Sequence, residues 1–502
     1  EFGHHHFGAT AGWNMETQYY KTFSASAENL ISDYLNDLGL AAPDTTTGEI
    51  IDNVSGGQTE YALMGFFGRA NYDYKGRYLF EVSARYDGTS RFAPGQRWGF
   101  FPSASVGWRI SEEPFFSPIR NTVNNLKVRG SIGTLGNQNV ANYIYIRSIK
   151  FSDLKHSFGG SSLPKYSYLT SPNASDLSWE TAEQWNVGLD ASAFNSRLQF
   201  TAETYVRNTK GMLTEGFALP AVYGADSPRM NTADLSTRGY ELSLQWRNQI
   251  KVAGKPFGYG IRASMSDFSS VITKFDNPEK AFAKTYYEGQ KLGDIWGFVC
   301  SGIFQSDEEA RDWTTVVYDG EGNPIGGVDQ SYMNTYLQNG VWSAGNLRFE
   351  DLDGDHKIST GENTANNPGD RKILGNSLPH LQYGITFDAD YLGFDFSIFF
   401  QGTGNHYWYP TGGNFAFWGP YSLGYCSFLP KNFLDNVWSK DNPDAYFPKP
   451  GSNRASNSRG ELGVVNSRYL QNIRYLRLKN LNFGYTIPQK FTHKFGLEKV
   501  RI

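Results

Sequence analysis

The sequence predicts an all-β protein, an antiparallel transmembrane β-barrel, and three observations support this fold class. Aromatic residues make up 16% of the chain, and membrane barrels place such rings in girdles at both lipid interfaces. Apolar and polar residues alternate in many short segments, as in strands with two different faces. The connections between these segments are alternately long and short. The low mean hydropathy of -0.49 agrees with a barrel, because only every second residue of its strands is apolar.

The composition argues against several other classes. The chain has 46 basic and 50 acidic residues with no basic block, so nucleic acid is not an expected partner. Cys300 and Cys426 belong to no CxxC or Cys/His cluster, which argues against a zinc site or a disulfide framework. No run of about 18 apolar residues is present, so a membrane-spanning helix is not expected.

Individual strands show two clearly different faces. In 78–87, Tyr78, Phe80 and Val82 share one face, whereas Glu81 and Arg85 share the other. In a barrel the apolar face meets lipid and the polar face lines the lumen. We predict about thirteen such strands, near 4–15, 61–74, 78–87, 98–110, 124–133, 181–194, 197–208, 238–248, 257–268, 381–391, 393–402, 473–487 and 497–502.

The connections between the predicted strands keep a constant parity along the chain. Tight turns are expected at 75–77, at 194–196 and near Leu392, and the intervening connections are longer. An up-and-down barrel has this asymmetry, with short periplasmic turns and long extracellular loops. The longest connections, 269–380 and 403–472, are predicted to be large extracellular insertions.

Several local features refine this prediction. An odd number of strands cannot close an antiparallel barrel, so residues 1–502 are expected to be part of a larger barrel whose last strands are absent. The chain does not begin with Met, and its start is interpreted as an internal cut. Leu478 and Leu481 lie on opposite faces of one predicted strand, which predicts a β-bulge near Lys479 and Asn480. Apolar spacing between Leu30 and Leu38 predicts a helical segment.

Motifs spread over most of the chain carry a family resemblance. The clearest are GRANY at 68–72, RYDGTSRF at 85–92 and WGFFPSASVGWR at 98–109, followed by LKVRGS at 126–131, GNQN at 136–139, LSWETAEQ at 177–184 and YLRLKNL at 475–481. With these motifs the chain resembles the SusC/RagA family of TonB-dependent outer-membrane transporters.

The resemblance implies a barrel of about 22 strands with a plug, in the outer membrane of a Gram-negative bacterium of the Bacteroidetes type, in contact with lipid and lipopolysaccharide. It also implies TonB-coupled active import of glycans or oligopeptides, with a SusD-like surface lipoprotein as lid. The plug and the TonB-contacting segment are expected in an N-terminal part that this chain does not contain. Two alternatives remain open: a secreted or cell-surface multi-domain β-sandwich protein that binds or degrades glycans, and a passive porin.

An acidic segment matches most positions of a calcium-binding loop. Asp351, Asp353, Asp355 and Glu362 take loop positions one, three, five and twelve, and Lys357 and Ser359 take positions seven and nine. The sequence therefore predicts a structural Ca²⁺ ion, or Mg²⁺ in its place. His356 stands where such loops normally have Gly. The alternative is an acidic surface turn without an ion.

A cluster of aromatic residues lies in the 403–472 insertion. Rings on long loops can stack on sugars or hold peptide side chains, so these residues are candidates for substrate contact. The alternative is that they pack the loop against itself or against the lid protein. The candidates are Trp408, Tyr409, Phe415, Phe417, Trp418 and Tyr421.

The remaining charged residues predict no chemistry. The lumenal charges have mixed sign and are interpreted as solvated lining and plug contacts; they include Glu81, Arg85, Glu203, Arg207, Glu241 and Arg247. No nucleophile-elbow, zinc-protease or P-loop motif is present. The sequence therefore predicts that the protein is not an enzyme.

Overall fold

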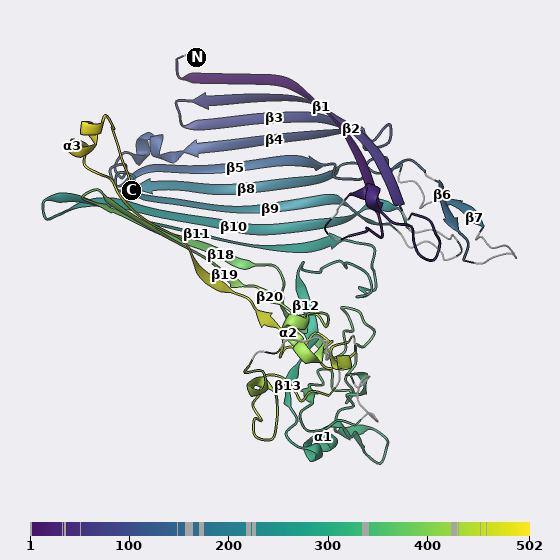
Figure 1. Cartoon of the computed structure of the whole chain (residues 1–502). Coiled ribbons are helices and arrows are strands. Elements are labelled where there is room, and N and C mark those ends of the chain that lie inside the picture. The colour runs from purple at the N-terminus through teal and green to yellow at the C-terminus, as the bar shows by residue number, and fades with distance from the viewer. Residues whose placement is uncertain are drawn as a thin grey trace. The chain divides into compact units, whose positions relative to one another are not determined.

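In the computed structural model, twelve antiparallel strands form the main sheet, and elaborate connections join them (Figure 1). The described residues are 3–32, 34, 37–50, 52–147, 149–155, 164–169, 175–216, 222, 227–333, 341–422, 429, 431–451, 453–457 and 459–502. The chain divides into two compact units, one made of 1–108, 129–185 and 207–233, the other of 109–128, 186–206 and 234–502. No helix among the described residues is long and apolar enough to cross a membrane.

The strands of the main sheet follow one another as neighbours in chain order. They are β1 (His5–Ala27), β2 (Asp52–Tyr74), β3 (Tyr78–Thr89), β4 (Trp98–Arg109), β5 (Val123–Asn137), β8 (Glu180–Ala193), β9 (Leu198–Glu215), β10 (Arg229–Val252), β11 (Lys255–Lys274), β18 (His380–Tyr391), β19 (Phe394–Asn405) and β22 (Tyr475–Tyr485). Twelve of the predicted strands are thereby confirmed. The strand predicted at 497–502 is present only in its last residues, after the short helix α3 (Gln489–Thr492): Arg501 forms an antiparallel bridge with Thr486. The backbone of Ile502 and Val500 is hydrogen-bonded to that of Tyr485 and Ile487.

The first connection differs from its prediction. Residues 16–60 were expected to form a loop, but β1 and β2 pair continuously from His5 opposite Tyr74 to Ala27 opposite Asp52. Along β1, Met15, Tyr19 and Phe23 continue the exposed apolar face of Trp13, which Thr17 and Lys21 interrupt. The helix predicted near Leu30 does not form in the described residues there, which contain a single 3₁₀ turn, Leu38–Leu40.

The short connections are tight hairpin turns with left-handed backbone. Lys75 and Gly76 have φ of 55° and 64°, and Leu392 and Gly393 have φ of 51° and 88°. Turns with positive φ at both central residues match the right-handed twist of the flanking strands. The tight turns predicted at 75–77, at 194–196 and near Leu392 are confirmed, and a further two-residue turn joins β10 to β11.

Large aromatic side chains are exposed on the apolar face of the sheet. On β3 and β4, Tyr86 and Trp98 stack with ring centroids 4.8 Å apart and remain 46% and 44% exposed. Phe80 and Phe100 share this face and are 48% and 62% exposed. Several large rings exposed together on one strand face indicate that this face contacts an apolar environment and not water.

The predicted bulge is present in β22. Phe400 pairs with Leu478 and Phe399 with Asn480, so Lys479 has no partner in the ladder. The extra residue changes the phase of the strand and returns Leu478 and Leu481 to the same face.

The two largest connections, 275–379 and 406–474, fold together within one compact unit, and we call their described residues the lobe (Figure 1). Its elements are β12 (Asp294–Phe298), β13 (Cys300–Ile303), α1 (Asp307–Thr314), β14 (Val317–Tyr318), β15 (Pro324–Gly326), β16 (Leu347–Phe349), β17 (Arg371–Asn376), β20 (Tyr407–Trp408), α2 (Phe415–Trp418) and β21 (Gln471–Asn472). Both connections contribute to a single hydrophobic core, which includes Phe304, Leu347, Phe349, Ile358, Trp418, Leu462 and Tyr469. Elsewhere, β6 (Ile149–Asp153) and β7 (Lys165–Leu169) form a separate hairpin.

Candidate functional site

Three aspartates converge between β16 and β17 of the lobe. Asp351, Asp353 and Asp370 each offer a carboxylate oxygen, and these oxygens lie within 4.8 Å of one another. Among the described residues, these three aspartates are the one group of at least three acidic, His or Cys side chains close enough to hold a metal ion. Hard oxygen ligands of this kind suit Ca²⁺ or Mg²⁺. The donor set therefore fits the predicted cation.

The loop that carries Asp351 is built by side-chain-to-backbone hydrogen bonds. Asp351 accepts hydrogen bonds from the N–H groups of Gly354, at 2.7 Å, and of His356, at 2.8 Å. His356 has a φ of 62°, so it adopts the left-handed conformation that Gly normally supplies at this loop position. Its ring Nδ1 lies 2.7 Å from the carbonyl oxygen of Gly327, which fixes the ring. The substitution of His for Gly is thus compatible with the turn.

Asp370 is the ligand candidate that the sequence analysis missed. It is fully buried and accepts hydrogen bonds of 2.7 Å from the N–H groups of both Leu352 and Ser359. Burial, together with the negative charges of Asp353 and Asp351, raises the pKa of its carboxyl group to about 6, although the two hydrogen bonds oppose the rise. A divalent cation would relieve the repulsion between these carboxylates. Asp370 lies outside the twelve-residue loop pattern from which the ligands were predicted. The only sequence feature that could have indicated it as a ligand is the place of an acidic residue directly before β17.

The other predicted ligands are not brought into this group. Asp355, Lys357 and Glu362 are exposed. Ser359 instead holds the loop, because its hydroxyl accepts a hydrogen bond of 3.0 Å from the N–H of Gly361. Ile358, which lies between Lys357 and Ser359 in the sequence, is fully buried in the lobe core. The structure therefore replaces Glu362 with Asp370 as the third convergent carboxylate.

The predicted aromatic cluster divides into buried and exposed members. Trp418, Tyr421 and Tyr409 are buried, with exposed fractions of 0%, 2% and 9%. Trp408 and Phe415 are 40% and 62% exposed. Burial favours the packing alternative for the first three, because their rings offer a ligand almost no surface. Phe417 is half-buried and packs against the lobe core. The exposed Trp408 and Phe415 remain candidates for substrate contact.

The buried rings also satisfy their polar atoms within the lobe. The hydroxyl of Tyr409 donates toward the carbonyl oxygens of Leu462 and Val464, at 3.0 and 2.7 Å, and Trp418 Nε1 donates to the carbonyl of Pro410 at 3.1 Å. Burial raises the pKa of Tyr409 well above its usual value. These contacts bind the second insertion to itself.

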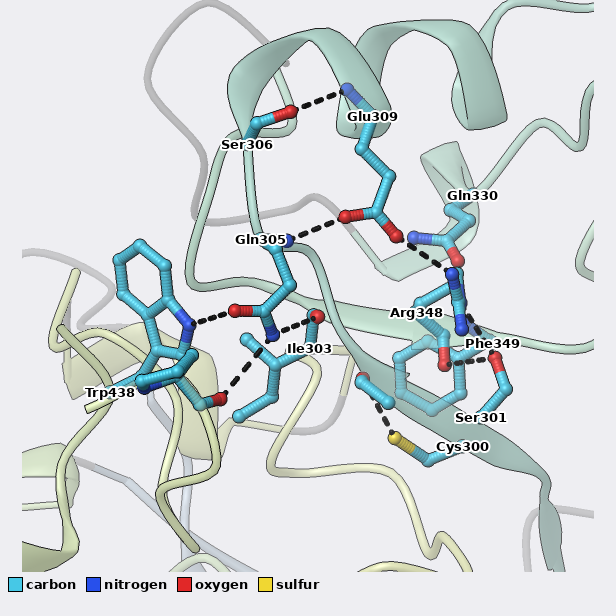
Figure 2. Close-up of polar contacts among 12 residues, drawn as sticks. Cys300, Ser301, Ile303, Gln305, Ser306, Glu309, Gln330, Arg348, Phe349 and Trp438 are labelled. Carbon is cyan, nitrogen blue, oxygen red and sulfur yellow. Dashed lines mark hydrogen bonds and ion pairs between the residues drawn. The ribbon is translucent and has the colours of Figure 1, made fainter. Parts of the chain in front are cut away.

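A polar network joins the start of helix α1 to β13 and β16 (Figure 2). Ser306 caps α1 by accepting a hydrogen bond of 3.0 Å from the N–H of Glu309. The Glu309 carboxylate accepts from the N–H of Gln305 at 2.7 Å and pairs with Arg348 at 2.7 Å. Arg348 Nε also donates to the hydroxyl of Ser301 at 3.0 Å. One carboxylate thus connects a helix cap to the β16 strand that leads into the acidic loop.

The same network reaches the second insertion. Gln305 accepts a hydrogen bond of 3.2 Å from Trp438 Nε1, as Figure 2 shows. Nearby, the fully buried Gln330 accepts from the N–H of Phe349 at 2.7 Å and donates to the carbonyl of Leu347 at 3.3 Å. The acidic loop is therefore anchored to a lobe in which both insertions are joined by core packing and hydrogen bonds.

The chain is similar to known proteins over almost its whole length. The model of the TonB dependent receptor-like, beta-barrel family matches residues 1–492. The chain belongs to this family. The sheet accordingly belongs to an outer-membrane β-barrel: its exposed aromatic face meets lipid, and its polar face lines the lumen.

The chain is similar over its whole length to TonB-dependent receptor P3 of Formosa agariphila, with 27% identity over 513 residues, 100% of this chain and 46% of that protein. It is also similar to TonB-dependent receptor SusC of Bacteroides thetaiotaomicron, with 26% identity over 456 residues, 88% of this chain and 40% of that protein. The chain therefore spans about half the length of the curated relatives it matches. These relatives confirm the SusC/RagA resemblance.

Solved structures agree with the fold. The RagAB peptide importer in its closed-closed state matches with a TM-score of 0.69 and 21% identity, covering 99% of this chain and 49% of the other. Its open-open state matches with a TM-score of 0.70 and 20% identity, covering 99% of this chain and 48% of the other.

Proposed function

We propose that the chain forms part of the wall of an active importer that carries glycans or oligopeptides across the outer membrane, powered through TonB. The observation that supports this most strongly is the family match over residues 1–492. Relatives named SusC and the RagAB peptide importer represent the wider group with which the chain shares sequence or fold. The relatives are named as receptors and importers, and the proposal assigns no catalytic step to the chain.

We also propose a SusD-like lipoprotein as the partner that covers the outer mouth. In this arrangement the lobe and the other long connections face the extracellular side, where cargo is captured. The strands provide a lumenal wall of polar side chains and a lipid-facing wall of aromatic and aliphatic ones. TonB then acts on a plug supplied by another part of the whole protein, and the cargo passes along the wall.

This proposal is tested by uptake in cells that carry the whole transporter. Fluorescent neutral oligosaccharides, acidic oligosaccharides and mixed oligopeptides are offered to three strains: the parent, a strain lacking the transporter gene and a strain lacking TonB. Uptake of at least one class should require both genes. Uptake that requires the transporter but not TonB would identify a passive porin, and uptake that requires neither would refute the proposal.

We further propose that Asp351, Asp353 and Asp370 bind a Ca²⁺ ion, or Mg²⁺ in its place, with a structural role. The convergence of their carboxylates within 4.8 Å supports this assignment. The ion would hold the 351–359 turn against the residue that precedes β17 and so order this part of the lobe. Asp355, Lys357, Ser359 and Glu362, the remaining residues of the predicted loop, would then shape or flank the turn.

A further inference from the structure

A groove of about 380 Å³ crosses the sheet on the lumenal side of β9, β10, β11, β18 and β19. Two rows of residues form it, and the strand register fixes both rows. In the first, Glu241 lies opposite Ser266, and Ser266 lies opposite Gln382. The second row follows two residues along each strand and comprises Ser243, Ser264, Gly384 and Gln401.

The groove exists because its floor is made of short side chains. Ser243, Ser264 and Gly384 occupy three neighbouring strands of one row. A Cβ atom at Gly384 would lie 3.0 Å from the ring of Phe399 and 3.4 Å from the hydroxyl of Ser264. The Phe399 ring therefore lies close over Gly384, and a side chain at 384 would crowd it.

The alternate residues of the same strands confirm which face carries the groove. Leu244 pairs with Ala263, Ala263 with Ile385, and Ile385 with Phe400. Successive residues of a strand point to opposite faces, so this apolar row meets lipid and the row of Ser243 and Gly384 faces the lumen. Phe399 is thus an aromatic side chain on the lumenal face, beside the lipid-facing Phe400.

The chemistry of the groove favours a sugar. Glu203 and Glu241 supply carboxylate acceptors, and Gln382 supplies an amide that both donates and accepts hydrogen bonds. The Oε1 of Gln401 accepts a hydrogen bond of 3.3 Å from Arg477, and its amide nitrogen supplies further donors. Hydroxyl groups of a sugar also donate and accept, while the C–H face of a sugar ring packs well on an aromatic ring. Among the described residues that line the groove, none is Lys or Arg.

Two other ligand classes fit less well. Anionic glycans would meet the two glutamates, which repel like charge. A peptide bound as an added strand needs a free sheet edge, but β10, β11 and β18 use their backbone groups in the ladders on both sides.

We propose that this groove is a lumenal subsite for neutral glycans in transit, with Phe399 as the stacking surface and Glu203, Glu241, Gln382 and Gln401 as hydrogen-bonding partners. The inference rests on the proposed import function, since it places a cargo contact on the wall of the pore. It assigns that cargo to the neutral sugars.

The test compares two adjacent phenylalanines in the full-length transporter, purified in detergent without its lipoprotein. Maltohexaose, cellohexaose, laminarihexaose and mannohexaose are titrated by calorimetry, with hexagalacturonate and hexalysine as anionic and peptide probes. At least one neutral hexasaccharide should bind, and Phe399→Leu should weaken it at least tenfold, because Leu has no ring face. Phe400→Leu, on the lipid side of the same strand, should change affinity less than twofold. Failure of all four neutral sugars, preference for hexalysine, or equal effects of the two variants would overturn the proposal.

Accessibility in the native protein is tested by labelling. Ser264→Cys is introduced with Cys426 replaced by Ser, and the protein is treated with a small polar maleimide. The bound neutral sugar should slow labelling of residue 264 at least fivefold, and should leave unchanged the labelling of a Ser397→Cys control on the same face. If residue 264 is protected without sugar, the plug covers the groove and the subsite is refuted.

The two proposals fail in different ways. TonB-dependent uptake of some cargo, together with a Phe399→Leu variant that binds and transports normally, would remove only the lumenal subsite. Absence of TonB-dependent uptake would remove the import function whatever the sugar titrations show.

Discussion

The buried carboxylate of Glu461 accepts a hydrogen bond of 2.7 Å from the backbone N–H of Leu347, a residue 114 positions earlier in the chain. Its other oxygen lies 3.3 Å from the amide nitrogen of Asn346. Glu461 is only 1% exposed and Leu347 is fully buried. This contact joins the second insertion to the first at the centre of the lobe, so the two connections are expected to fold as one unit.

Replacing Glu461 by Ala should therefore destabilise the lobe by about 2–3 kcal/mol, because a buried N–H would lose its charged partner. Thermal unfolding followed by tryptophan fluorescence, combined with limited proteolysis of detergent-solubilised protein, measures this change. Glu308→Ala, at an exposed position of the same lobe, is the matched control and should unfold like the parent. Equal behaviour of the two variants would show that the insertions do not depend on this contact.

The aromatic cluster gives a second prediction. Trp418→Ala should cost about 3–5 kcal/mol of lobe stability, because it empties a fully buried site. Phe415→Ala, at a ring that is 62% exposed, should leave stability unchanged. If exposed rings contact cargo, Phe415→Ala and Trp408→Ala should lower uptake while the lobe remains folded. Unaltered uptake in both variants would leave the cluster with a packing role alone.

Cation binding gives a third prediction. Protein treated with EDTA should bind Ca²⁺ in calorimetry, and Asp353→Asn should weaken that binding at least tenfold, since one of three convergent carboxylates loses its charge. Glu362→Gln should change affinity little, because Glu362 is exposed and lies outside the convergent group. Calorimetry without heat of Ca²⁺ binding, or a larger effect of Glu362→Gln, would contradict the proposed ligand set.

Cys300 gives a prediction about pH. Burial raises the pKa of its thiol to about 11, and the reactive species in alkylation is the thiolate. Labelling of Cys300 by a maleimide should therefore be very slow at pH 7 and should rise about tenfold with each pH unit up to that pKa. Mass spectrometry of the labelled peptide checks this, with protein unfolded in denaturant as the positive control. Rapid labelling of the folded protein at pH 7 would show that the lobe opens.

The bulge in β22 predicts an asymmetry between two deletions. Deleting Lys479 should be tolerated, because Leu478 and Asn480 already pair with the consecutive residues Phe400 and Phe399. Deleting Asn482 should prevent assembly, because a shift of one residue turns neighbouring side chains to the wrong face. Heat-modifiable migration on gels reports barrel assembly. Similar migration of both variants would mean that register at this strand is not fixed by the two faces.

Much of the barrel could be predicted from the sequence because each strand carries its own pattern. The alternation of Tyr78, Phe80 and Val82 with Glu81 and Arg85 can be recognised in the sequence without knowledge of the partner strand. The same holds for the bulge, since the change of phase between Leu478 and Leu481 is local. The strand ends were less predictable. The ladder of β1 with β2 continues to Ala27 and Asp52, past Lys21, which interrupts the apolar face formed by Tyr19 and Phe23.

The sequence by itself determined the fold class, the order of the strands, the tight turns and two of the three convergent aspartates, because these depend on residue spacing within about ten positions. Only the tertiary structure decided that Trp418 is buried, that Asp370 joins Asp351 and Asp353, and that Phe399 lies over Gly384 in a groove. Each of these depends on contacts between segments that are distant in sequence or on separate strands. The physical reason is that burial and convergence are properties of packed neighbours, which local periodicity does not encode.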